Sequence, residues 1–356
     1  MLARVRAETG RTARWTGTED ERVEPADGRR ESIERMSDAS IPEPGTPSAA
    51  KAPGGPGQPS RPGRLGVGVI SAGRVGAVLG SALRSVEHQL VGVHAVSEAS
   101  RERAEMLLPG VPLLEVEEIV RRSELVLLAV PDDELSGLVS GLAEVGAWQM
   151  GQIVVHTSGR YGVGVLAPAQ AAGAIPIALH PAMTFSGWSM DLARLTGCPM
   201  AVTAPPAFLP VGQALAVELG GEPFVLPEEA RPAYHAALAH GANHLVTLVG
   251  QAVRALEAAG VEDGAATLRP LLTAALDGAL QEGADSALTG PVARGDAGTV
   301  ASHLTALAGL RDEEGRPLAD AVDTYRALAA ATVDRREATG RLREDQVRAL
   351  RDALDD

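Results

Sequence analysis

The amino-acid sequence predicts an α/β domain with a mostly parallel sheet, followed by an all-helical second domain. From Arg64 to about Pro227, short β-branched and apolar runs alternate with helical segments, as strands and crossover helices do in a parallel sheet. After Pro227, long stretches rich in alanine and leucine follow at helical spacing, and no strand-like run interrupts them. We therefore place the α/β domain at residues 64–227 and the helical domain at residues 228–338.

Six runs have the length and composition of strands: Leu65–Ile70, Leu90–Val96, Leu125–Val130, Ile153–His156, Ile175–Leu179 and Met200–Thr203. Four later stretches have helical periodicity: Glu228–Ala259, Gly264–Leu280, Thr299–Leu310 and Leu318–Glu337. These apolar helices leave hydrophobic surface for a second copy of the chain to bury, so a homodimer is expected.

The two ends of the chain have a different composition. Residues 1–63 mix charges of both signs with Pro, Gly and Ser and show no hydrophobic period, which predicts a disordered arm. Met36 offers a second start, so residues 1–35 are candidates for an over-extended gene prediction. Residues 339–356 are strongly charged and are interpreted as a tail, either a solvated helix or a frayed end.

Composition excludes several classes of protein. The formal net charge of −14 argues against a nucleic-acid partner, which needs clustered Lys and Arg. No apolar run approaches the roughly 20 residues that span a bilayer, and the first residues lack the basic-then-apolar pattern of a secretory signal. A cytoplasmic protein with no membrane contact is therefore expected. The single cysteine, Cys198, excludes an intramolecular disulfide and a multi-cysteine zinc site.

The first predicted strand runs into a glycine-rich turn and then a helix, which is the context that the dinucleotide-binding fingerprint requires. Gly73 would let the backbone approach a pyrophosphate, Gly76 would let the helix pack on the strand, and the helix N-terminus would offer its N–H groups to the phosphates. Ser71 replaces the usual first glycine, and its Cβ makes the tight turn less comfortable. The sequence predicts a Rossmann-type dinucleotide site that includes Ser71, Gly73, Arg74, Val75 and Gly76.

The end of the second strand discriminates between NAD and NADP. NAD enzymes usually place an acidic residue there to hold the ribose 2′-hydroxyl. Here hydroxyl and guanidinium donors suit a 2′-phosphate instead. With the arginine of the turn, these candidate groups are Ser97, Ser100, Arg101 and Arg74. Glu98 lies beside them, but NADP is the expected cofactor.

Three later strands end in segments that would meet at the same edge of the sheet, where open α/β sheets bind their ligands. The segments are Ala129-Val130-Pro131-Asp132, His156-Thr157-Ser158-Gly159 and His180-Pro181. We expect the cofactor to contact Ala129, Val130, Pro131, Thr157 and Ser158. We expect His180, after the third of these strands, to belong to the catalytic residues.

A polar patch interrupts the first helical stretch of the second domain. His240, Asn243 and His244 are spaced by three and four residues and therefore share one helix face. The two histidines could bind a metal, although the glutamate of the familiar zinc motif is missing, or could be hydrogen-bonded at a domain seam. We favour a third interpretation, in which this face looks into the cofactor cleft, Asn243 touches the substrate and no metal is bound.

In combination, these segments resemble those of a known family. They are Val69–Gly76, Ala129–Asp132, His156–Gly159, His180–Pro181, His240–His244 and Leu288–Asp296. The chain resembles the bacterial Rossmann-like proteins with a C-terminal helical domain of unknown function, over about Arg64 to Leu310. That family is similar in architecture to ketopantoate reductase, pyrroline-carboxylate reductase, 6-phosphogluconate dehydrogenase and the deazaflavin-dependent NADP oxidoreductases. The resemblance implies an NADP-binding domain and a helical substrate and dimerisation domain similar to the 6-phosphogluconate dehydrogenase C-terminal fold.

One departure from these relatives concerns the proton donor. Ketopantoate reductase and the hydroxyacid dehydrogenases use a lysine on the first long helix of the second domain, whereas the only lysine here is Lys51. Asn243 resembles a substrate-orienting position of those enzymes. The donor is then expected to be His240, His180 or a bound water, and a histidine suits the task because its pKa, roughly 6.5, lies near working pH.

The glycine-bounded loop Gly290–Asp296 contains a further candidate, Arg294. Its guanidinium could clamp a substrate carboxylate in fork geometry. The alternative is a surface pair between Arg294 and Asp296 that only shapes the loop.

The leading hypothesis is an NADP(H)-dependent oxidoreductase that acts on a small carbonyl, hydroxy-acid or imine compound, with the nicotinamide supplying the hydride. Because the folded part has no lysine and no obvious acid, a non-catalytic NADP-binding protein with a regulatory or interaction role is the alternative. An enzyme that pairs NADP with a deazaflavin is a third possibility.

Overall fold

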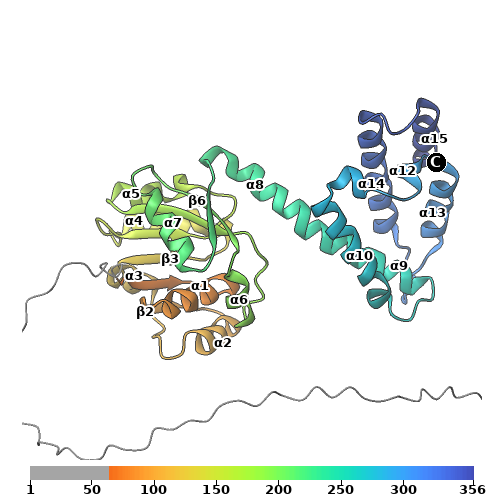
Figure 1. The fold of residues 1–356 in the computed structure, drawn as a ribbon. Helices are drawn as coiled ribbons and strands as arrows, with labels where there is room; N and C mark the ends of the chain where they lie inside the picture. Colours follow the sequence, from red (N-terminus) through yellow and green to blue (C-terminus); the bar gives the residue numbers. More distant parts are fainter. Residues whose placement is uncertain (1–63) are drawn as a thin grey trace, which may run out of the picture. The chain divides into compact units, whose positions relative to one another are not determined.

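A seven-stranded sheet forms the first half of the described chain. The computed structural model describes residues 64–356, so the predicted arm at residues 1–63 and the second start at Met36 lie outside it. The strand order is β2-β1-β3-β4-β5-β6-β7 (Figure 1). The strands are β1 Gly66–Ile70, β2 Gln89–His94, β3 Leu125–Leu128, β4 Ile153–His156, β5 Ile175–Pro181, β6 Pro199–Thr203 and β7 Glu222–Val225.

The sheet is mostly parallel, as predicted, and only β5 and β6 pair in antiparallel fashion. β2 and β3 lie on opposite sides of β1, so the chain reverses its direction of winding between the β1 and β3 carboxyl ends. Open α/β sheets bind their ligands at such a switch point. The topology therefore places the candidate site at the edge where β1 and β3 end.

Two features of the sheet differ from the sequence prediction. β7 has only four residues, includes Pro223 and is largely exposed, so no buried-strand pattern marks it. β5 extends to Pro181, and His180 therefore lies inside the strand, opposite Ala201, rather than in the loop that follows. The antiparallel partner β6 continues the hydrogen-bond ladder beyond Leu179.

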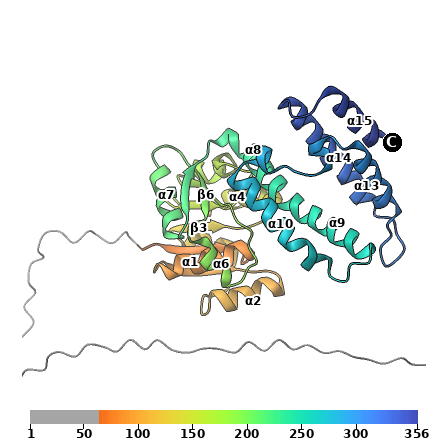
Figure 2. The ribbon, with the colours of Figure 1, turned by 45° about the vertical axis from the view of Figure 1, so that its right-hand side comes forward.

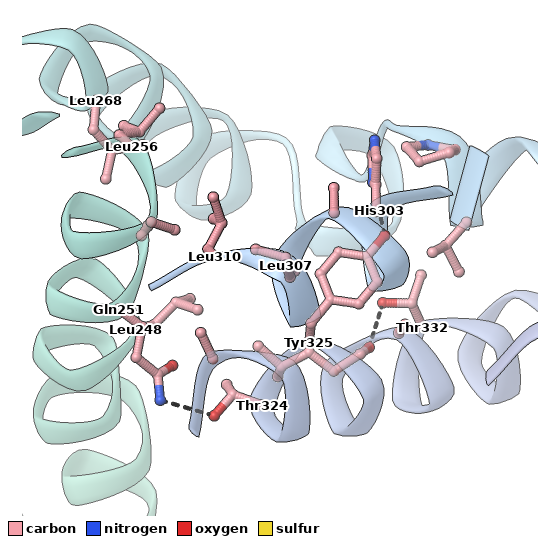
Figure 3. Close-up of a pocket in the computed structure, with 18 of the residues that line it drawn as sticks. Leu248, Gln251, Leu256, Leu268, His303, Leu307, Leu310, Thr324, Tyr325 and Thr332 are labelled. Carbon is pink, nitrogen blue, oxygen red and sulfur yellow. Dashed lines mark hydrogen bonds between the residues drawn. The ribbon is translucent and has the colours of Figure 1, made fainter. Parts of the chain in front are cut away.

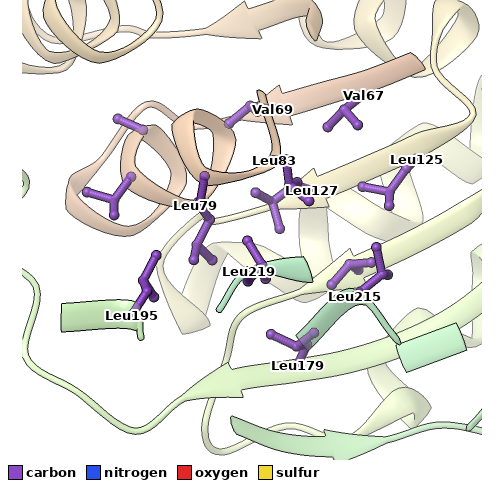
Figure 4. Packing of buried hydrophobic residues seen from close by; sticks show 14 of the residues in the cluster. Val67, Val69, Leu79, Leu83, Leu125, Leu127, Leu179, Leu195, Leu215 and Leu219 are labelled. Carbon is purple, nitrogen blue, oxygen red and sulfur yellow. The ribbon is translucent and has the colours of Figure 1, made fainter. Parts of the chain in front are cut away.

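Helices cover both faces of the sheet (Figure 1), and the strands bury side chains on each face in turn. Figure 4 shows the buried cluster on one of the two faces. The helices are α1 Arg74–Ser85, α2 Glu98–Leu107, α3 Val116–Arg122, α4 Asp132–Glu144, α5 Ala167–Ala171, α6 Met190–Leu195 and α7 Leu209–Glu218. Val69 and Leu127 pack with α1, α2, α6 and α7, whereas Ile70 and Leu128 pack with α3, α4 and α5. Burial on both faces explains why these strands are continuous apolar runs in the sequence.

The rest of the described chain is helical, as predicted (Figure 2). The helices are α8 Arg231–Leu238, α9 His244–Ala258, α10 Gly264–Gln281, α11 Ala284–Ala287, α12 Pro291–Arg294, α13 Ala297–Gly309, α14 Ala319–Ala338 and α15 Glu344–Asp355, and a π-helical turn, η3 Ala239–Asn243, joins α8 to α9. None of the helices within residues 64–356 has the length and hydropathy needed to cross a membrane.

The segment interpreted as a charged tail, residues 339–356, contains α15, and this helix is part of a hydrophobic core. Val347, Leu350 and Leu354 are buried against α13 and α14. These residues are spaced by three and four positions, so they form one apolar stripe on an otherwise charged helix. The high overall charge of the segment hides this stripe in the sequence.

His156, the last residue of β4, is fully buried and neutral. Its Nδ1 accepts a hydrogen bond from the N–H of Ser158 (3.2 Å), and its Nε2–H donates to the carbonyl oxygen of Gly162 (2.9 Å). A backbone N–H can only donate and a carbonyl can only accept, so these partners fix the tautomer. Burial and then the nearby charge of Arg231 lower the pKa of His156 to about 3, although the Gly162 bond opposes them.

The free energy of unfolding should fall as the pH drops below roughly 6.5, because the unfolded imidazole binds a proton there and the folded one does not until about pH 3. One such histidine accounts for a loss of about 3 kcal/mol at pH 4. In His156→Gln we expect the free energy of unfolding at about pH 7 to be lower by about 1–3 kcal/mol and to depend less on pH. Urea denaturation at each pH measures both quantities, and an unchanged pH dependence would assign the proton uptake to other groups.

Candidate functional site

The turn between β1 and α1 has an unusual backbone conformation. Ser71 has a φ of 77°, in the left-handed region that favours glycine. The N–H of Ala72 donates to the carbonyl oxygen of His94 on β2 (2.9 Å), which ties the turn to the neighbouring strand. A serine held at positive φ is locally strained, and such strain is concentrated at binding sites.

The two glycines of the turn have different roles. A Cβ on Gly76 would lie 2.1 Å from the carbonyl oxygen of Ser71 and 2.9 Å from the Cβ of Ala129, so only glycine allows α1 to cross here. A Cβ on Gly73 would meet only the Ser71 hydroxyl, at 3.5 Å, so space remains outside the turn. Val75 packs against the apolar core. The start of α1 has no side-chain cap and no acidic residue, which leaves its N–H groups available to an anion.

The predicted 2′-phosphate residues sit at the start of α2. The hydroxyl of Ser97 accepts from the N–H of Ser100 and caps the helix, and the hydroxyl of Ser100 donates to the carbonyl oxygen of Ser97 (2.7 Å). The hydroxyl proton of Ser97 remains available for another acceptor, whereas the hydroxyl of buried Ser100 already donates its proton to the Ser97 carbonyl. Arg101 is exposed, and within residues 64–356 its guanidinium makes one long hydrogen bond, of 3.5 Å, to the carbonyl of Ala95.

Arg103 is a functional candidate that the sequence interpretation missed. A Cβ on Gly187, in the loop after β5, would lie 3.0 Å from both the Nε of Arg103 and the Cγ of Arg74, so the two arginines flank this glycine. The Nε–H of Arg103 is buried and finds no hydrogen-bond partner within residues 64–356. An unused buried donor is rare in folded proteins and indicates a missing acceptor.

The segments after β3 and β4 continue along the same edge of the sheet. The N–H of Ala129 donates to the carbonyl of Ile70 on β1 (3.0 Å), and the N–H of Thr157 donates to the carbonyl of Leu128 on β3 (3.2 Å). Ala129 also lies against the helix start that contains Gly76. Val130 and Thr157 are half-buried and Pro131 is exposed. These residues therefore line the edge next to the glycine turn.

Ser158 shapes the turn after β4. Its buried hydroxyl accepts hydrogen bonds from the N–H groups of Arg160 (3.2 Å) and Tyr161 (3.1 Å). Its carbonyl oxygen accepts a third hydrogen bond, from the guanidinium of Arg231 (2.8 Å). Of its polar groups, the hydroxyl proton is the one left for a cofactor.

Arg231, the first residue of α8, is 0% exposed, and no sequence pattern predicts this burial. Its guanidinium donates only to neutral oxygens: Oγ1 of Thr203 (2.8 Å) and the carbonyls of Ser158 (2.8 Å), Ala178 (2.9 Å) and Ala201 (3.2 Å). Burial lowers its pKa to about 10, so the group remains charged at neutral pH. A buried cation therefore fastens the start of α8 to the turn after β4 and to β5 and β6.

Tyr234 lies three residues further along α8, on the same face as Arg231, and contacts His180. The Tyr234 hydroxyl is 2.9 Å from Nδ1 of His180, and the two rings meet edge to face with centroids 5.5 Å apart. His235 and Gly159 enclose the other side of the His180 ring. Burial and the charge of Arg231 lower the pKa of His180 to about 4, so this predicted catalytic residue is neutral at working pH.

The polar patch of the second domain lies on η3 and the start of α9. The Nδ1 atoms of His240 and His244 are 2.9 Å apart, so the two histidines share one hydrogen bond, and Asn243 is exposed beside them. Within residues 64–356, no group of three or more His, Cys, Asp and Glu side chains is arranged to hold a metal ion. π-helical turns often mark functional positions. No hydrogen bond in the described part of the chain joins this patch to His180.

Arg294 is the exposed last residue of α12, and its carbonyl oxygen accepts a hydrogen bond from Gln346 (3.0 Å). Asp296 caps α13 by accepting from the N–H of Thr299 (3.1 Å). The surface pair that was the alternative for Arg294 is not formed, because the Asp296 carboxylate is occupied by this cap.

Comparisons with known proteins agree with this fold. Residues 52–181 match the Rossmann-like domain and residues 198–332 match the domain of unknown function DUF2520. Among curated proteins, none matches the sequence.

The solved structures with a similar fold include the following three. A protein from Bacteroides fragilis described as a putative NADP oxidoreductase is 19% identical with a TM-score of 0.62, over 76% of this chain and 98% of its own. An imine reductase from a Pseudomonas species is 17% identical with a TM-score of 0.56, over 82% and 100%. An imine reductase from Myxococcus stipitatus in complex with NADP+ is 18% identical with a TM-score of 0.54, over 77% and 94%. At these identities the likeness establishes the fold alone.

The two matched regions follow each other in the order that the motifs indicate, the glycine turn in the first and the His240 patch in the second. The first region covers the glycine turn and β1 to β5, and the second begins with β6, α7 and β7 and continues through the helices to most of α14. The chain belongs to the Rossmann-like proteins that carry a C-terminal DUF2520 domain.

Proposed function

We propose that this protein is an NADP(H)-dependent oxidoreductase that acts on a small carbonyl, hydroxy-acid or imine compound. The turn between β1 and α1 carries the proposal. Ser71 is held at positive φ, Gly76 contacts its carbonyl oxygen, and an uncapped helix N-terminus follows. This combination suits the pyrophosphate of a dinucleotide, which binds close to the backbone and takes hydrogen bonds from free N–H groups.

The proposed cofactor contacts follow the edge of the sheet from this turn. Ser71–Gly76 would hold the pyrophosphate, Ala129–Pro131 would line the ribose, and Thr157 and Ser158 would meet the nicotinamide. The bound nicotinamide would supply the hydride. The similar imine reductase from Myxococcus stipitatus is described in complex with NADP+, which supports a nicotinamide cofactor here.

The preference for NADP over NAD rests on three arginines near the end of β2. Arg74 and Arg103 flank Gly187, and the buried Nε–H of Arg103 lacks an acceptor that a 2′-phosphate oxygen would provide. Arg101 is exposed on the same helix as Arg103 and adds a third guanidinium. No carboxylate in the described part of the chain pairs with any of these arginines.

Replacing Arg103 by Ala should weaken NADPH binding about 10- to 100-fold, since a hydrogen bond to a charged group contributes about 1.5–3 kcal/mol. Arg101→Ala should have a smaller effect in the same direction. NADH affinity should change less than about twofold, because NADH has no 2′-phosphate. Fluorescence titration with both nucleotides measures this selectivity.

Arg84→Ala is the matched control, because Arg84 lies at the far end of α1 and donates to the carbonyl of Pro109. Equal losses for NADPH and NADH in Arg103→Ala would contradict the 2′-phosphate pocket. Absence of binding to either nucleotide in the unaltered protein would contradict the proposed function itself.

For the substrate half of the site, we propose that His180, His240 and Asn243 act beside the nicotinamide and that Arg294 binds a substrate carboxylate. His180 is supported by its place on β5, next to the β4 end that would meet the nicotinamide. Asn243 and His240 are supported by the π-helical turn that presents them. Arg294 is supported by its exposed guanidinium, which no carboxylate of the described residues engages.

We also propose that the protein is a homodimer through α9 and α10. In residues 232–290 only Gln251 and Gly264 are buried, although both helices are rich in leucine and alanine. Leu271 is 67% exposed and Leu280 is 77% exposed. Apolar helices of this length gain their stability from packing and not from helix propensity, so they require a partner surface.

The same helices border an open apolar cavity of about 750 Å³, with α13 and α14 on its other side (Figure 3). Leu248, Leu256, Leu268 and Leu307 line it, and Tyr325 projects into it (Figure 3). A second copy of this chain is the occupant that explains both features, because one chain contains both the exposed apolar helices and the cavity that would receive them. A two-fold dimer uses such a self-complementary surface twice.

Leu271→Glu combined with Leu280→Glu should weaken dimerisation at least tenfold, because each change places a charge on a surface that the dimer would bury. Sedimentation equilibrium over a range of protein concentrations measures the association. Met150→Glu is the control, since Met150 is 88% exposed in the α/β domain. A monomer at all concentrations for the unaltered chain would refute the dimer.

A further inference from the structure

A reductase needs a source of protons as well as hydride. When hydride adds to a carbonyl carbon, the π electron pair moves to oxygen, and the resulting alkoxide must take a proton. The described residues contain no lysine, and His180 is neutral with a pKa of about 4, so neither group supplies that proton near neutral pH. The phenol of Tyr234 is an O–H acid at the same edge of the sheet.

We propose that Tyr234 is the proton donor of the reaction, that His180 positions its hydroxyl, and that the substrate is a carbonyl compound. This inference rests on the proposed oxidoreductase function and goes further by naming the donor and the substrate class. His180 is thus a positioning residue, and Tyr234 takes over the donor role that the histidines were expected to have.

The geometry holds the phenol at a defined point. Arg231 fastens the start of α8 through four hydrogen bonds, and Tyr234 follows three residues later on the same helix face. Its ring packs edge to face against Phe224, with centroids 6.0 Å apart, and against His180. When the Nδ1–H of neutral His180 donates to the phenol oxygen, the phenol proton is free to point at a substrate.

The charges around the phenol suit a donor that becomes an anion. Burial raises the pKa of Tyr234, which keeps it protonated at working pH, while the nearby charge of Arg231 opposes that rise and stabilises the phenolate once the proton has left. Cys198 adds a smaller effect that raises the pKa. The other charged or titratable neighbours, Asp132 and His235, act on His180, and Glu228 acts on Arg231.

The proton passes from the Tyr234 hydroxyl to the alkoxide oxygen. The alkoxide oxygen forms a bond to the phenol proton, the O–H bond of Tyr234 breaks with its electron pair left on the phenol oxygen, and solvent later returns the proton. The reduced nicotinamide is the two-electron reductant and the carbonyl carbon is reduced. An iminium substrate already carries its proton and a positive charge, so it needs no donor and would be repelled by Arg231. The site therefore favours a C=O group over a C=N group.

The experiment compares the unaltered protein with Tyr234→Phe. Thr305→Val is the control, because it removes an exposed hydroxyl of α13, which donates to the carbonyl of Ala301 (3.0 Å) and does not line the proposed dimer cavity. Each protein is titrated with NADPH by fluorescence. Each is then assayed for NADPH consumption with small aldehydes, ketones and 2-oxo acids and, separately, with cyclic imines.

We expect Tyr234→Phe to bind NADPH within about twofold of the unaltered protein and to lose at least about 100-fold in kcat with carbonyl probes, which is the scale of general acid catalysis. KM should change little, and Thr305→Val should leave both parameters unchanged. Loss of kcat below about threefold, faster reduction of imines than of carbonyls, or NADPH binding without reduction of any carbonyl probe would each overturn the proposal. Failure of the unaltered protein to bind NADPH would instead overturn the proposed function.

A second readout does not depend on turnover. The alkaline absorbance titration of tyrosinate, taken as the difference between the unaltered protein and Tyr234→Phe, isolates the ionisation of Tyr234. NADPH should raise the pKa of Tyr234, because a cofactor bound beside the phenol removes water from it and brings negative phosphates. An unchanged Tyr234 titration in saturating NADPH would place the phenol outside the cofactor site and overturn the proposal.

Discussion

The buried guanidinium of Arg231 is the interaction on which both the fold and the chemistry of this protein depend. The usual partner of a buried arginine is a carboxylate, but here the acceptors are one hydroxyl and three carbonyl oxygens, from the turn after β4 and from β5 and β6. An unpaired ion costs several kcal/mol to bury, and only a complete set of hydrogen bonds offsets that cost. The start of α8 is therefore held in the single position where these four acceptors converge.

The same charge adds to the effect of burial on the protonation of two neighbouring histidines. Burial alone disfavours a charged imidazole, and the positive field of Arg231 adds to that effect at both His156 and His180. His156 uses its neutral state structurally, because its two ring nitrogens bridge Ser158 and Gly162 and so shape the turn after β4. His180 uses its neutral state to hold Tyr234. A single buried cation thus helps to keep both imidazoles neutral, one in a turn and one in a side-chain pair.

Much of the sheet could be predicted from the sequence because parallel strands buried on both faces are continuous apolar runs, as in Leu125–Leu128. The glycine turn could be predicted even with Ser71 in place of glycine, since its position between strand and helix carries the information. β7 was not predicted, because an edge strand of four residues needs little apolar character. The packing of α15 was not predicted, because its apolar stripe is surrounded by charged residues.

The candidate site also contains some residues that the sequence predicts and others that it does not. The residues next to the glycine turn follow from strand order, because every parallel strand delivers its carboxyl end to one edge. The burial of Arg231 and of the Arg103 Nε atom could not be predicted, because arginine is normally a surface residue. The groups that surround them are distant in the sequence. The carbonyl oxygens of Ala178 and Ala201 accept hydrogen bonds from Arg231, and the loop that contains Gly187 lies against Arg103. No local spacing records such an arrangement.

The absence of lysine from residues 64–356 is consistent with this electrostatic design. A lysine beside Arg231 would meet a like charge in a poorly solvated place, and both effects would strip its proton before any reaction began. A phenol behaves in the opposite way, because it is neutral before the reaction and becomes an anion only after it has donated its proton. Next to a fixed buried cation, the acid whose conjugate base is negative is the one that gains stabilisation during proton transfer. The tyrosine at position 234 and the arginine at position 231 therefore suit each other, one helical turn apart.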